Sequence, residues 1–136
     1  MMSRDRQIQI AVFLLRVVAA GLFIQVGGLK LWGWFGGMPG GALPPLMLVA
    51  GVLEFFGGIA ILFGLFTRPV AFILSGEMAV AYFMGHAAQG NLFVPLLNQG
   101  QPAVLLCFIF LFLAAYGAGA WSLDAYWKTR KGTATA

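Results

Sequence analysis

The sequence predicts an all-α integral membrane protein, a four-transmembrane-helix bundle with both termini in the cytoplasm. Hydrophobic residues make up 61% of the 136 residues and charged residues only 9%, whereas a soluble domain of this size is about one-quarter charged. Four apolar segments are each long enough to cross a hydrocarbon core, which takes roughly 20 helical residues. Alternation of polar and apolar residues is absent, which argues against a membrane barrel.

Glycine and proline divide the apolar sequence into these segments. "GWFGGMPGGALPP" separates the first two, "TRP" forms a tight turn before the third, and "QGNLFVPLLNQGQP" leads into the fourth. Arg16 interrupts the first apolar run early and hydrophobicity then resumes, so we expect an uncleaved span rather than a cleaved signal peptide. We therefore predict one domain, residues 1–136, with helices at about 8–32, 43–66, 69–88 and 102–121.

The basic residues predict the orientation. In a four-span arrangement Lys30 alone falls on one side, and six basic residues fall on the other: Arg4, Arg6, Arg68, Lys128, Arg130 and Lys131. Basic residues concentrate on the cytoplasmic side of membrane proteins, so both termini are expected there. Topology and attraction to anionic lipid account for the net charge of +4, and no nucleic-acid partner is needed to explain it.

Arg16, Glu54 and Glu77 are charged residues that lie deep within the apolar segments, and we expect them to form one cluster. Counted along ideal helices, Arg16 and Glu77 lie about 12 Å from the cytoplasmic end, with Glu54 about one turn deeper. Charged groups in membrane helices usually face the bundle interior and pair with one another. One interpretation is structural, an ion pair and a neutral carboxyl that hold the helices in register. The other is functional, because one arginine facing two carboxyls leaves a charge that a proton or ligand would balance.

A second group of polar and aromatic residues lies toward the opposite membrane face. Lys30, Trp32 and His86 fall near that interface, where aromatic residues and lysines commonly serve as anchors. The alternative is a shallow pocket for the polar headgroup of a quinone or lipid, with Lys30 and His86 as hydrogen-bond donors. Both interpretations remain open from the sequence.

The residue inventory limits the chemistry that the chain performs by itself. Cys107 is the only cysteine and His86 the only histidine, so the sequence predicts no thiol pair, iron–sulfur cluster, zinc site or bis-histidine haem. "GGMPGG" lacks the strand, helix and lysine of a phosphate-binding loop. We therefore expect no intrinsic cofactor and no metal site, and no catalytic residue is assigned.

Several blocks of the sequence resemble the DoxX family of small bacterial inner-membrane proteins. They are "LLRVVAAGLFIQVGGLKL", "GVLEFFGGIAILFGLFTRP", "GEMAVAYFMGHA" followed by "PLLNQG", and "GAGAWSLD", in that order over roughly residues 11 to 125. On the family pattern the characteristic positions are Arg16, Gly21, Gly27, Lys30, Glu54, Gly58, Gly64, Arg68, Glu77, His86 and Ser122 to Asp124. The chain departs from the pattern at Gln101 and Pro102, where relatives often carry an acidic residue, and at Ala118, where they often carry proline.

The resemblance implies a multi-pass protein of the bacterial inner membrane that is linked to redox chemistry. Family members are associated with quinone-linked sulfur oxidation, terminal oxidases and oxidative-stress assemblies. We therefore expect an accessory or anchor subunit of a redox or respiratory assembly that binds quinone or lipid, with membrane lipid and a redox enzyme, or further copies of itself, as partners. The alternative is a small-molecule or proton permease that uses Arg16, Glu54 and Glu77. A catalytic quinone oxidoreductase ranks third, since the sequence shows no redox centre.

Overall fold

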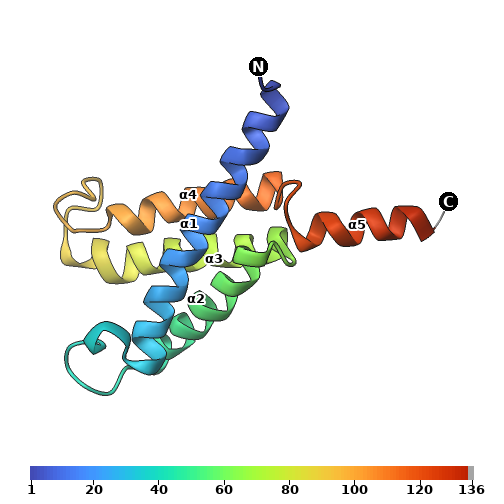
Figure 1. Cartoon of the computed structure of the whole chain (residues 1–136). Helices are drawn as coiled ribbons and strands as arrows, with labels where there is room; N and C mark the ends of the chain where they lie inside the picture. The colour runs from blue at the N-terminus through green and yellow to red at the C-terminus, as the bar shows by residue number, and fades with distance from the viewer. Residues whose placement is uncertain (135–136) are drawn as a thin grey trace.

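The computed structural model describes residues 1–134, so the predicted domain, residues 1–136, extends past the described part of the chain (Figure 1). Every regular element in the described residues is helical, which confirms the all-α fold class. Five α-helices carry the architecture: α1 (Arg4–Trp32), α2 (Pro45–Phe63), α3 (Thr67–Ala81), α4 (Gln101–Tyr116) and α5 (Leu123–Ala134). A short 3₁₀ turn, η1 (Trp34–Gly36), lies between α1 and α2.

Local sequence signals set the helix ends. The Ser3 side chain accepts a hydrogen bond from the Arg6 backbone N–H (3.3 Å) and caps α1. Gly33 ends α1 and Gly64 ends α2, with φ of 69° and 68°, a left-handed conformation that glycine adopts without steric cost. Proline at the first position of α2 fits a helix start, because the missing N–H would have no helical partner there.

The third helix changes its winding near its end. After Ala81 it continues as a π-helical turn, η2 (Tyr82–His86), and then as a 3₁₀ turn, η3 (Ala87–Gln89). The whole stretch Thr67–Gln89 is long and apolar enough to cross a membrane, as are α1 and α2. Large apolar side chains are exposed on the outward faces of these helices, as expected for contact with lipid.

The predicted fourth span, residues 102–121, is longer than the helix in the structure. Helix α4 has 16 residues, about 24 Å at the usual rise per residue, and ends at Tyr116 because Gly117 adopts a φ of 95°. The chain then forms an irregular loop and the separate helix α5, which the sequence analysis did not predict. Three helices, rather than four, therefore meet the length expected of a span within the described residues.

The helices form two antiparallel pairs, α1 with α2 and α3 with α4, while α2 and α3 touch each other much less (Figure 1). Glycine allows the close approach of α1 and α2. A β-carbon built at Gly27 would lie 2.5 Å from the Phe55 backbone nitrogen, and one at Gly58 would lie 3.1 Å from the Ile24 nitrogen. The N-terminus, the α2–α3 turn and the end of α4 lie at one end of the bundle, which we call the basic end.

Candidate functional site

A cavity of about 550 Å³ lies where α2 and α3 separate, and we call it the α2–α3 cavity. Its walls are mainly aliphatic side chains of these two helices, including Leu53 and Val80. Four ionisable residues from three helical segments line it: Lys30, Glu54, Glu77 and His86. A mostly apolar cavity with a few polar groups is typical of sites that bind small molecules.

Lys30 and Glu54 form an ion pair at this cavity. The Lys30 Nζ lies 2.6 Å from Glu54 Oε1, and the two side chains are only 10% and 3% exposed. Gly51, one turn before Glu54, brings α2 against α1 at this level, since a β-carbon there would lie 3.1 Å from the Lys30 β-carbon. The second carboxylate oxygen of Glu54, Oε2, is buried and has no hydrogen-bond partner.

Glu77 adds a second carboxyl beside this ion pair. Both of its carboxyl oxygens are buried and accept no hydrogen bond from a donor group, and a protonated Glu77 lies within hydrogen-bonding reach of Glu54. A buried polar group without a partner costs free energy, so a carboxyl in this state favours a proton, a bound donor or a cation. One lysine thus faces two carboxyl groups, and the cavity retains unused acceptor capacity.

His86 reaches the same cavity, although nine residues of ideal α-helix would place it on the face opposite Glu77. The π-helical turn Tyr82–His86 explains the difference, because each residue of a wider turn advances by less than the roughly 100° of an α-helix. The His86 Nδ1 lies 3.0 Å from the Asn98 carbonyl oxygen. A carbonyl only accepts, so Nδ1 is the donor and a neutral ring keeps Nε2 as an acceptor.

Arg16 lies elsewhere. The prediction that Arg16 joins Glu54 and Glu77 in one cluster is therefore wrong. The Arg16 guanidinium is buried and donates to the backbone carbonyls of Trp121 (2.7 Å), Leu62 (3.5 Å) and Ala118. Helix α1 begins well before the bundle, which places Arg16 level with the last turn of α2. Glu54 lies eight residues before Leu62, about 12 Å along the helix axis.

Trp32 also lies outside the α2–α3 cavity. Its side chain is 53% exposed and its ring packs edge-on against Phe55, with ring centroids 4.4 Å apart. Trp34 packs beside the same ring at 5.7 Å. These contacts fit an aromatic anchor near the membrane interface, which was one of the two interpretations of Trp32.

Tyr82 and Asn98 hold the loop that contacts His86, and sequence reasoning did not single them out. The Asn98 amide donates to the Tyr82 hydroxyl (3.2 Å) and to the Asn91 carbonyl (3.2 Å), and the Tyr82 hydroxyl donates to the Leu92 carbonyl (2.6 Å). This network fixes the 90–100 loop, whose Asn98 carbonyl holds His86. Asn98 is a polar residue in an apolar stretch, which was the available signal, but its partners follow only from the loop conformation.

Comparison with known proteins places the chain in a family. The DoxX family model matches residues 11–87. An uncharacterized protein of Haemophilus influenzae is 48% identical over 114 residues, covering 81% of this chain and 85% of that protein. The inner membrane protein YqjF of Escherichia coli K12 is 35% identical over 131 residues, covering 85% of this chain and 90% of that protein.

No solved structure matches the chain. The long apolar helices and the similarity to a named inner membrane protein agree on a location in the membrane. The family match covers more than half of the sequence and includes Arg16, Lys30, Glu54 and Glu77. This chain is an integral membrane protein and belongs to the DoxX family.

Proposed function

We propose that this protein holds a polar-headed amphiphile, a quinone or a lipid, in the α2–α3 cavity and serves as an accessory or anchor subunit of a redox or respiratory assembly in the bacterial inner membrane. The observation that carries the binding proposal is the pair of buried, unpartnered oxygens of Glu77 beside the Lys30–Glu54 ion pair. These groups and His86 line a cavity whose other walls are apolar.

The residues of the cavity suit a quinone ring or a comparable headgroup. The volume of about 550 Å³ falls within the range of roughly 300–1,000 Å³ usual for small-molecule sites. The Lys30 ammonium is a donor for a carbonyl oxygen, and Glu77 is an acceptor for a hydroxyl. Aliphatic residues of α2 and α3 would contact the ring and tail. A bound quinone would supply the capacity to carry electrons and protons, which the side chains themselves lack.

The topology we propose has four spans, with both termini in the cytoplasm. Helix α4 is about 24 Å long, short of the roughly 30 Å hydrocarbon thickness. The loop before it carries exposed Phe93, Leu96 and Leu97, which would extend the apolar part of this segment into the membrane. The basic residues gather at the opposite end, which supports a cytoplasmic basic end.

The proposed redox role follows from the redox associations of the DoxX family. The α2–α3 cavity is the place where the protein would hold a quinone in that role. A membrane subunit that presents a quinone to a partner needs no redox centre of its own. The partner would be a redox enzyme docked on the protein, or further copies of the chain would complete the assembly.

Purification in native membrane patches with mass spectrometry tests the proposal. The wild-type protein is expected to retain a quinone or a defined lipid, and Glu77→Gln to lose most of it. Asp5→Asn is the matched control, because it makes the same acid-to-amide change at an exposed site on α1. Co-purification of a redox enzyme would support the subunit role. A bare oligomer with no bound amphiphile would contradict the proposal.

A permease is the second candidate, and the same two unpartnered oxygens of Glu77 favour it. Two neighbouring carboxyls inside the membrane can pass a proton between them, and Arg16 no longer takes part. Proton entry into liposomes containing the protein, followed with a pH-sensitive dye, distinguishes this function. Flux that Glu77→Gln abolishes and Asp5→Asn preserves would favour the permease over the binding subunit.

A further inference from the structure

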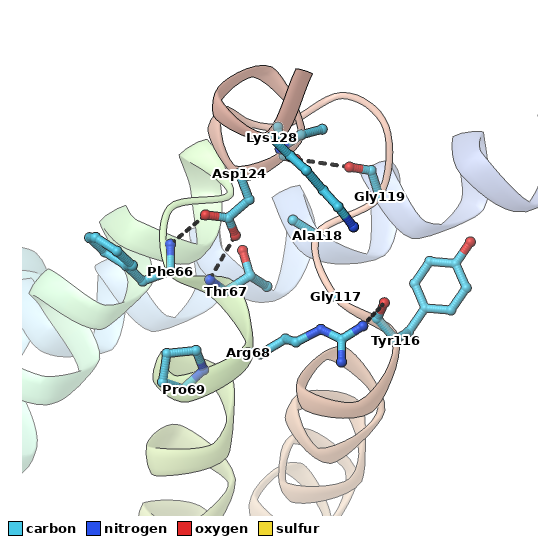
Figure 2. A pocket seen from close by; sticks show the side chains of 12 residues that line it. Phe66, Thr67, Arg68, Pro69, Tyr116, Gly117, Ala118, Gly119, Asp124 and Lys128 are labelled. Atoms are coloured by element: carbon cyan, nitrogen blue, oxygen red, sulfur yellow. Dashed lines mark hydrogen bonds between the residues drawn. The ribbon is translucent and has the colours of Figure 1, made fainter. Parts of the chain in front are cut away.

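A second cavity, of about 420 Å³, lies at the basic end between the start of α3 and the loop that joins α4 to α5 (Figure 2). Its polar lining comes from residues far apart in the sequence, Thr67, Arg68, Ser122, Asp124 and Lys128. Phe66, Pro69 and Tyr116 supply apolar walls. We call it the basic-end cavity. It shares no lining residue with the α2–α3 cavity.

Two cationic side chains converge on this cavity from different helices. Arg68 extends from the first turn of α3 and Lys128 from α5, and Figure 2 shows both reaching toward the same space. Arg68 makes one long hydrogen bond, 3.4 Å from Nη2 to the Tyr116 carbonyl, so most of its five N–H donors are free. The Lys128 side chain makes no hydrogen bond or ion pair within residues 1–134.

The carboxylate in the cavity is already occupied. Asp124 accepts hydrogen bonds from the backbone N–H groups of Phe66 (2.8 Å) and Thr67 (2.9 Å), one on each oxygen, as Figure 2 shows. These bonds hold the carboxylate at the start of α3, and it forms no ion pair with Arg68 or Lys128. The buried Arg16 adds positive charge behind the wall, where its guanidinium binds the Ala118 carbonyl. The cavity therefore carries net positive charge, because one carboxylate stands against Arg68, Lys128 and the nearby Arg16.

Its surroundings indicate a location at the membrane surface. Phe66 and Trp127 are both exposed and pack together with ring centroids 6.1 Å apart. Exposed aromatic pairs beside basic residues are typical of the headgroup region. A ligand there would place an anion between Arg68 and Lys128 and an apolar part against Phe66 and Pro69.

We propose that the basic-end cavity binds a phosphate group, held between Arg68 and Lys128. The phosphate can come from an anionic phospholipid headgroup or from a soluble phosphate compound. Arginine binds phosphate through paired N–H donors, and lysine adds a point charge. The apolar walls and the aromatic pair favour the phospholipid.

The test uses the full chain in nanodiscs and two probes, phosphatidylglycerol and inorganic phosphate. Lipid retention is measured by native mass spectrometry in mixtures of phosphatidylglycerol and phosphatidylcholine. Two basic side chains near a membrane surface together favour an anionic lipid by about thirty-fold. The double variant Arg68→Gln/Lys128→Gln is expected to lose most of that preference. Arg4→Gln/Arg6→Gln removes the same charge from exposed positions on α1 and is expected to keep it.

The outcomes separate the two sources of phosphate. Preference for phosphatidylglycerol that inorganic phosphate does not compete away identifies the lipid headgroup, and competition at millimolar phosphate identifies the soluble source. Equal losses in the two double variants, or no preference in the wild type, would overturn the proposal. Should the Arg68→Gln/Lys128→Gln variant fail to fold, Lys128→Gln alone is informative, because the Lys128 side chain is exposed and makes no hydrogen bond or ion pair in the described residues. This single variant should lose about five-fold or more of the preference for phosphatidylglycerol.

Discussion

Two cations on α1 meet different surroundings, and the contrast separates a structural site from a binding site. Arg16 donates to backbone carbonyls of α2 and of the loop after α4, which are neutral and fixed by the fold. Lys30, four turns later on a similar face, meets the carboxylate of Glu54 with Glu77 beside it. The arginine's partners are part of the backbone, whereas the lysine's neighbours include Glu77, whose oxygens accept no hydrogen bond from a donor group.

Replacing Arg16 by alanine should have the largest effect on stability. The change leaves three buried or half-buried carbonyls without their donor, so we expect a loss of about 3–5 kcal/mol in the free energy of unfolding. Unfolding in detergent, followed by near-ultraviolet circular dichroism, measures it. Arg4→Ala, at an exposed site, is expected to stay within about 0.5 kcal/mol of the wild type. Equal stability of the two variants would show that Arg16 does not stabilise the fold.

The α1–α2 contact sets the level of both cations, and Gly27→Ala should weaken it. The new β-carbon would lie 2.5 Å from the Phe55 nitrogen, and backbone cannot move aside as a side chain can. Overpacking of this kind costs about 1–3 kcal/mol. Gly21→Ala is the matched control on the same helix, because no atom lies within 4 Å of its β-carbon position. Thermal unfolding that ranks Gly21→Ala as the worse variant would contradict the packing described here.

Asp124, like Arg16, forms hydrogen bonds with backbone groups, and its replacement should have the next largest effect on stability. Asp124→Ala removes the acceptor for two backbone N–H groups at the start of α3, which should cost about 1–2 kcal/mol, as for other helix caps. Asp124→Asn keeps one acceptor oxygen and should recover part of that loss. Hydrogen exchange of the Thr67 amide is the measurement, and unchanged protection in Asp124→Ala would count against the cap.

Glu77→Gln should have the smallest effect on stability, because neither Glu77 oxygen accepts a hydrogen bond from a donor group and the new amide can still donate one to Glu54. We expect a change of at most about 1 kcal/mol, in either direction. Thermal unfolding of the ligand-free protein measures it, with Glu54→Gln as the comparison. Glu54→Gln should be worse, since it leaves Lys30 without its carboxylate. The reverse order would show that Glu77 is structural.

The sequence predicted the fold class and membrane location well because both follow from composition and from segment length. It also identified Lys30, Glu54, Glu77 and His86 as residues to examine, since ionisable groups in apolar segments are conspicuous. Their grouping was not predictable, for two physical reasons. The depth of Arg16 depends on how far α1 extends beyond the bundle, and the direction of His86 depends on the π-helical turn, which leaves no periodic signal in "AYFMGHA".

The basic-end cavity could not be predicted from the sequence either. Arg68 and Lys128 lie sixty residues apart, and they converge only because α4 stops at Gly117 and the loop after it places the first turn of α5 next to the first turn of α3. Ala118 to Trp121 are apolar, so the predicted fourth span extends to residue 121. The carbonyls of this loop instead bind Arg16, a tertiary contact that overrides local hydrophobicity.

The most direct test of the central claim is equilibrium binding of a short-chain ubiquinone to the protein in nanodiscs, compared between the wild type and Glu77→Gln. If the α2–α3 cavity is the ligand site, the wild type binds saturably and Glu77→Gln weakens binding at least ten-fold, about 1.4 kcal/mol, while its unfolding changes little. Equal binding by both proteins, or binding no greater than to empty nanodiscs, would contradict the account.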